Sequence, residues 1–143
     1  MPKAGASPDL DALAEYMGSL DTVDASPHRN ADGSLTAQAV EGKSLFAASG
    51  CLGCHGGPDF SGADDALHDI GTLKPSSGQR LGGVLAGIDT PTLRGAWSVA
   101  PFLHDGSAAS VTEAIAAHSS AGSLRAEDLA RLSAYVMQID ARD

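Results

Sequence analysis

The sequence contains few aromatic residues: three Phe, two Tyr and one Trp make up 4% of its 143 residues, although 43% are hydrophobic. A chain of this length is long enough for one domain with a hydrophobic core. Because interiors are closely packed and aromatic side chains are scarce, the core must be filled by Leu, Ala and Val, or by a large apolar group that is not protein.

Basic residues are also scarce, since 9 Lys and Arg stand against 18 Asp and Glu and give a net charge of −9. This balance argues against a nucleic-acid partner and is compatible with a basic protein partner. No apolar run approaches the length of a membrane span. The opening residues, MPKAGASPDLDALAEY, lack the apolar segment of a signal peptide, so we interpret Met1 as an expression start with any export signal removed.

No segment alternates apolar and polar residues as a half-buried strand does. Helical spacing of apolar residues predicts helices over 9–21, 34–49, 110–118 and 128–140. Residues 56–109 are rich in Gly, Pro, Ser and Asp, and such a long irregular stretch is unusual unless it wraps around something. The sequence therefore predicts an all-α fold with long irregular loops.

The predicted helices carry recognisable start signals. Ser7, Thr36, Ser110 and Ser123 precede apolar helical patterns and are expected to cap them. Gly42 weakens the helix in which it lies, so we expect another helix to cross closely at this position.

Two of these helices repeat each other. DLDALAEYMGSLD, at 9–21, aligns without gaps with DLARLSAYVMQID, at 128–140, and the same apolar face recurs in both. One interpretation is two generic amphipathic helices; the other takes 1–24 as the last helix of a preceding module. We expect the second arrangement, with a linker at 25–33 and the main domain at 34–143.

Both cysteines of the chain lie in one short motif, Cys51-Leu52-Gly53-Cys54-His55. A structural zinc site would need four ligands, but the remaining histidines are scattered singly. A thioredoxin-type pair would follow a strand, and none is predicted before Cys51. A disulfide, or two buried thiols beside an incidental histidine, would leave the long loop and the scarce aromatics unexplained.

Covalent attachment of haem c explains all three reactive positions of this motif. The two thiols add to the two vinyl groups of the porphyrin, and the imidazole of His55 then binds the iron. A haem would also be the large apolar group that the composition calls for. We therefore predict a c-type cytochrome with a cytochrome c-like fold, in which a few helices and long loops wrap around one covalently bound haem.

The segments GCLGCHGGPDFSG, LHDIGT and DTPTLRGAWSVAPFLHDGSAASVTEAI, together with the Tyr-bearing last helix, resemble a known superfamily. It comprises the bacterial di-haem cytochrome c peroxidases and the methylamine-utilisation haem proteins. The similarity covers about residues 34–140 and is to the C-terminal, electron-transferring haem domain. The N-terminal, peroxidatic haem domain has no counterpart here beyond its possible last helix, at 8–20.

The resemblance implies a sixth ligand on the helix that follows the HDG motif, where family members carry a Met or a Tyr. His118 occupies that place and shares an apolar stripe with Val111, Ala114 and Ile115. A lone histidine on an apolar face is often a core residue, but the chain has no Met between Cys51 and Met137. We therefore expect His55 and His118 to form a bis-histidine iron site.

The resemblance also implies supporting residues around the haem. His104, in APFLHDG, and His68, in LHDIG, match family positions that line the haem pocket. Arg94 is a candidate partner for a haem propionate. Trp97 either packs on the macrocycle or fills the core.

Six-coordinate iron has no open position for a substrate, so the leading hypothesis is an electron-transfer domain of a larger redox protein. A peroxidase in which His118 is displaced and a ligand-sensing haem domain are the alternatives. The expected partner is a redox protein or a fused enzyme module, with a possible homodimer through the N-terminal helix. Because haem c is attached outside the cytoplasm, we expect a periplasmic or extracellular location.

Overall fold

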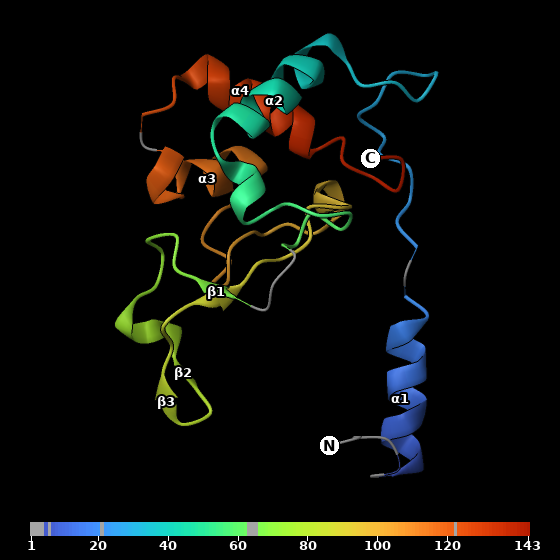
Figure 1. The fold of residues 1–143 in the computed structure, drawn as a ribbon, viewed down its shortest axis with the longest axis vertical. Coiled ribbons are helices and arrows are strands. Elements are labelled where there is room, and N and C mark those ends of the chain that lie inside the picture. Colours follow the sequence, from blue (N-terminus) through green and yellow to red (C-terminus); the bar gives the residue numbers. More distant parts are fainter. Residues whose placement is uncertain (1–4, 6, 21, 63–65, 122) are drawn as a thin grey trace.

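In the computed structural model, described residues are 5, 7–20, 22–62, 66–121 and 123–143, and they form four α-helices joined by long loops (Figure 1). The α-helices are α1 (Pro8–Gly18), α2 (Ala37–Ala48), α3 (Val111–Ala116) and α4 (Ala126–Val136). Short 3₁₀ helices are η1 (Cys51–Gly53), η2 (Pro75–Ser77), η3 (Ala96–Ser98) and η4 (Ser119–Ala121). The strands are β1 (Leu67–His68), β2 (Gln79–Arg80), β3 (Gly83–Val84) and β4 (Ile88–Asp89).

The prediction of an all-α, cytochrome c-like fold is wrong, because the loop region contains two small antiparallel sheets. In one, β1 pairs with β4 so that Leu67 faces Asp89 and His68 faces Ile88. In the other, β2 and β3 form a hairpin that pairs Gln79 with Val84. Each strand has two residues, which is too short for the alternation that reveals strands in a sequence.

The helical predictions are confirmed in their main features. The side chains of Ser7, Thr36 and Ser110 each accept a hydrogen bond from a backbone N–H of the first turn, as N-caps do. The prediction for Ser123 is wrong, because α4 begins at Ala126 without a side-chain cap.

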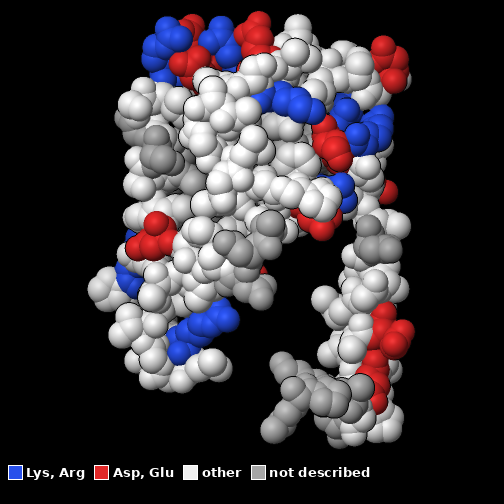
Figure 2. Space-filling view, in the orientation of Figure 1, with Lys and Arg blue, Asp and Glu red and all other residues white. Residues whose placement is uncertain are grey.

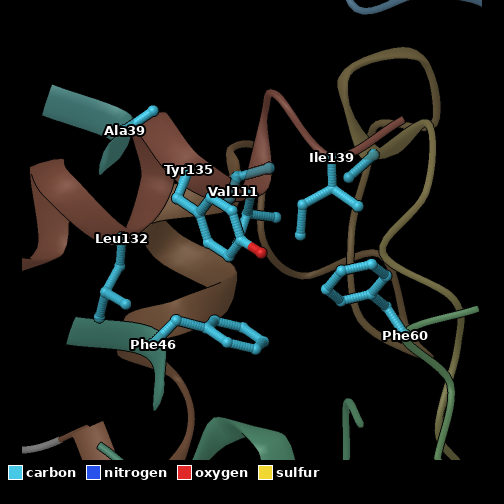
Figure 3. Close-up of a cluster of buried hydrophobic side chains, with 9 residues drawn as sticks. Ala39, Phe46, Phe60, Val111, Leu132, Tyr135 and Ile139 are labelled. Atoms are coloured by element: carbon cyan, nitrogen blue, oxygen red, sulfur yellow. The ribbon is translucent and has the colours of Figure 1, made fainter. Parts of the chain in front are cut away.

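The crossing of α2 and α4 forms the centre of the core (Figure 3). Phe46 of α2 and Tyr135 of α4 meet edge to face, with ring centroids 5.4 Å apart. The expected close crossing at Gly42 is confirmed, since a Cβ atom there would lie 2.0 Å from the carbonyl oxygen of Arg131. The buried cluster comprises Ala39, Phe46, Phe60, Ala96, Val111, Leu132, Tyr135, Val136 and Ile139.

A buried ionic network joins the N-terminal loop to the C-terminus. The carboxylate of Asp140, which is fully buried, lies 3.1 Å from the Nε of Arg29 and also accepts hydrogen bonds from Arg142 and the backbone of Ser26. The bonds from Arg142, then those from Ser26, hold the pKa of Asp140 well below its usual range. Arg29 also pairs with Asp143. The loop before α2 is therefore fixed to the end of the chain.

Helix α1 differs sharply from its repeat, α4. No described residue of α1 is buried. Its apolar face, Leu10, Leu13, Tyr16 and Met17, and Leu20 just beyond the end of the helix are 54–60% exposed. Figure 1 shows α1 standing beside the rest of the chain, and Figure 2 shows acidic side chains along it. The two helices thus share one apolar pattern, but these side chains are packed in the core on α4 and exposed to solvent on α1.

Replacement of Gly42 by Ala should lower the free energy of unfolding by about 2–3 kcal/mol, because the added methyl group overlaps the α4 backbone. Urea unfolding followed by circular dichroism measures the change. The matched control is Gly18→Ala, since a Cβ atom there meets nothing within 4 Å. Equal stability of the Gly42→Ala chain would contradict the observed crossing.

Replacement of Asp140 by Asn should cost about 3 kcal/mol, because two arginines lose a buried carboxylate. The lowered pKa means that the carboxylate stabilises the fold above the pKa of an unfolded Asp, about 3.9. This contribution is lost as the pH falls towards the folded-state value. Urea unfolding at pH 7 and pH 3 should therefore show a smaller acid effect in the Asn variant, with exposed Asp89→Asn as the control.

Candidate functional site

The Cys–His motif forms a tight turn directly after α2. The chain passes through η1, and the N–H of His55 donates to the carbonyl oxygen of Cys51 at 2.8 Å. Both cysteines are free and half-buried, and burial raises the pKa of Cys51. A Cβ atom at Gly56 would lie 2.5 Å from the carbonyl oxygen of Leu52, so the residue after the histidine has no room for a side chain.

The turn brings His55 near His118, which lies two residues beyond the C-terminal end of α3. Their ring centroids are 6.5 Å apart and the ring planes are inclined by 51°. The Nδ1 of His55 lies 3.0 Å from the carbonyl oxygen of Phe60, and the Nδ1 of His118 lies 2.8 Å from that of Ala114. Since a carbonyl only accepts, Nδ1 is the donor in both hydrogen bonds, and in a neutral imidazole Nε2 then carries the lone pair.

The separation of the two rings fits one metal ion between them. A first-row metal ion bonds an imidazole nitrogen at about 2.0–2.1 Å, and the ring centre lies about 1 Å beyond that nitrogen, which gives about 6 Å between two opposed rings. The observed value is 6.5 Å. Burial lowers the pKa of His55, which favours the neutral, ligating form of its imidazole. This separation is compatible with His55 and His118 as ligands of one haem iron, which stays a prediction.

His68 lies beside the same turn. The pairing of β1 with β4 holds this residue, and its Nδ1 is 3.6 Å from the Sγ of Cys54. The structure thus brings five of the predicted site residues together: Cys51, Cys54, His55, His68 and His118. The role of His68 in lining a haem pocket stays a prediction.

Arg94 has an unused donor. One guanidinium nitrogen lies 3.2 Å from a carboxylate oxygen of Asp59. Its Nε, by contrast, is the one buried side-chain nitrogen or oxygen that lacks a hydrogen-bond partner within the described ranges. Such a group usually has a partner in the functional protein, and an acidic group of a bound ligand would satisfy it. This observation fits a haem, which carries two propionates.

The remaining predicted residues have other surroundings. His104 is exposed, and its Nε2 lies 2.8 Å from the Oγ of Ser77 on η2. Trp97, on η3, is half-buried. Among the residues that the structure describes, no group of three or more His, Cys, Asp or Glu side chains could hold a metal ion. Also within those residues, no helix is long and apolar enough to cross a membrane.

Sequence reasoning missed the groups that orient the two imidazoles. These are the backbone carbonyls of Phe60 and Ala114, which any residue type could supply. Phe60 has a positive φ of 54°, a conformation that is unfavourable for a residue with a Cβ atom. Nothing in the residue types of this segment indicated that conformation.

Two curated proteins are related to this chain in sequence, whereas no protein-family model matches it. Hydrazine synthase subunit gamma of Kuenenia stuttgartiensis is 30% identical over an alignment of 141 residues, and the match covers 74% of this chain and 40% of that protein. Cytochrome c551 peroxidase of Nitrosomonas europaea is 30% identical over 91 residues, which cover 57% of this chain and 27% of that protein. The chain therefore spans less than half the length of either relative.

The fold is also similar to a solved structure, hydrazine synthase of Kuenenia stuttgartiensis pressurised with 20 bar xenon. The TM-score is 0.71 with 29% sequence identity, and the match covers 93% of this chain and 56% of that chain. Similarity to a cytochrome peroxidase and to hydrazine synthase supports the predictions of a cytochrome-related haem protein and of a haem cofactor.

Proposed function

We propose that this chain is an electron-transfer domain with a single, covalently attached haem c and two axial histidines. The observation that carries the proposal is the 6.5 Å separation of the His55 and His118 rings, each of which donates from Nδ1 to a backbone carbonyl. Bound haem supplies reversible one-electron chemistry at its iron.

Each residue of the site has a distinct task in this proposal. Cys51 and Cys54 would form the two thioethers that anchor the porphyrin. His55 and His118 would bind the iron through Nε2, in the tautomer that their Nδ1 hydrogen bonds favour. The unpaired Nε of Arg94 would receive a propionate. His68, beside Cys54, lines the pocket near one thioether.

Two imidazoles donate more electron density than an imidazole and a methionine, so a potential below that of a Met-ligated relative is expected. If His55 and His118 both held the iron, no coordination position would be left for peroxide or another substrate. The chain would therefore pass single electrons between an enzyme module and an outside protein.

A peroxidase is the second candidate, and one of the relatives carries that name. His118 lies just beyond the end of α3, a helix of six residues, and is followed directly by η4. Movement of this short segment would withdraw one imidazole and open a coordination position. A five-coordinate, high-spin ferric spectrum of the unaltered protein would favour this candidate.

The partner in the proposal is a redox protein or a fused enzyme module. One relative is a subunit by name, which supports an assembly with other polypeptides. Haem c is attached outside the cytoplasm, so the proposed location is periplasmic or extracellular. We further propose that residues 1–24 are the last helix of a preceding module, since α1 repeats the pattern of α4 but leaves its apolar face exposed.

Replacement of His118 by Ala should convert a low-spin ferric spectrum into a high-spin one, because one strong axial ligand is lost. Optical and electron paramagnetic resonance spectra of the haem-loaded protein measure the change. His28→Ala is the matched control, since His28 is exposed in the N-terminal loop. A low-spin spectrum that survives the loss of His118 would remove this residue from the iron.

In the absence of its neighbour, the apolar face of α1 should drive association into a homodimer as the protein concentration rises. Light scattering on the chain measures its mass. The double change Leu13→Ser and Tyr16→Ser should restore the monomer, whereas Glu15→Gln, away from the apolar face, should not. A chain that stays monomeric throughout, or a dimer that tolerates the double change, would refute association through α1.

A further inference from the structure

The hydrogen bond that orients His55 depends on an unusual backbone conformation. Phe60 is buried and has a φ of 54°, in the left-handed region that residues with a Cβ atom rarely adopt. This conformation directs its carbonyl oxygen to the Nδ1 of His55, at 3.0 Å. A strained residue of this kind persists only where its surroundings hold it.

The restraint comes from a separate segment, residues 92–94. The hydroxyl of Thr92 donates to the carbonyl oxygen of Asp59 at 2.5 Å, and so fixes the peptide unit that joins Asp59 to Phe60. The N–H of Arg94 donates to the same hydroxyl oxygen at 3.1 Å, and its guanidinium pairs with the Asp59 side chain at 3.2 Å. The rotation φ of Phe60 is about the bond that directly follows this peptide unit. The hydrogen bonds of Thr92 and Arg94 with Asp59 therefore hold Phe60 in its left-handed conformation.

We propose that Thr92 is a positioning residue for the His55 imidazole and acts through the backbone of Asp59 and Phe60. The Thr92 hydroxyl holds the Asp59 carbonyl, and this peptide unit restricts φ of Phe60. The conformation of Phe60 in turn places its carbonyl oxygen against the Nδ1 of His55. This inference rests on the proposed function, since it concerns how strongly His55 donates to a haem iron.

The consequence is electronic as well as structural. A hydrogen bond from Nδ1 to an acceptor increases the basicity of the opposite nitrogen, Nε2, and so strengthens its bond to the metal. A weaker hydrogen bond would leave the ferric state less stabilised, and the reduction potential would rise. Thr92 itself is exposed, so its hydroxyl can be removed without opening a cavity in the core.

The test compares Thr92→Val, which keeps the shape but removes the hydroxyl, with Thr92→Ser, which keeps the hydroxyl. The matched control is Thr112→Val, because the Thr112 hydroxyl is also exposed and lies 2.8 Å from the Ser133 hydroxyl. Spectroelectrochemistry gives the midpoint potential of the haem-loaded chain. Resonance Raman spectra give the iron–imidazole vibrations.

We expect Thr92→Val to raise the potential and to lower the frequency of the iron–imidazole vibration. Thr92→Ser and Thr112→Val should keep the parent values. A potential unchanged in Thr92→Val, or a shift as large in Thr92→Ser, would overturn the inference. If the proposed function itself is wrong, the result differs, because the unaltered chain would then bind no haem covalently or would lack the low-spin spectrum.

Discussion

The site depends on two hydrogen bonds from imidazole to backbone. The carbonyl oxygens of Phe60 and Ala114 accept from the Nδ1 atoms of His55 and His118, and in the proposed site these bonds leave each Nε2 to bind the iron. Without these bonds each ring could rotate or present its proton instead of its lone pair. The electron-transfer proposal depends on this pair of constraints more than on any other feature.

The rest of the fold holds the segments that supply these groups. The Cys–His turn follows the end of α2, which crosses α4, and α3 packs on α4 and is followed two residues later by His118. The ionic network of Arg29 and Asp140 closes the N-terminal loop onto the same C-terminal helix. Hydrophobic packing and buried charge pairing thus both stabilise the helical core.

Local features of this protein could be predicted from its sequence, and long-range backbone geometry could not. The Cys51–His55 motif, three helix caps and the crossing at Gly42 each follow from a few neighbouring residues. The pairing of Leu67 with Asp89 joins segments too short and too distant for any periodicity to show. The left-handed conformation of Phe60 is imposed by residues more than thirty positions away, and the exposure of α1 contradicts its own amphipathic pattern.

The central claim is that a porphyrin is tethered to Cys51 and Cys54. The most direct measurement is the intact mass of the chain after denaturation, from cells able to attach haem c and from cells that lack this ability. The account predicts a mass increase of one haem over the 14.4 kDa polypeptide only in the first preparation. A bare polypeptide mass from both preparations, or a chromophore that denaturation removes, would contradict it.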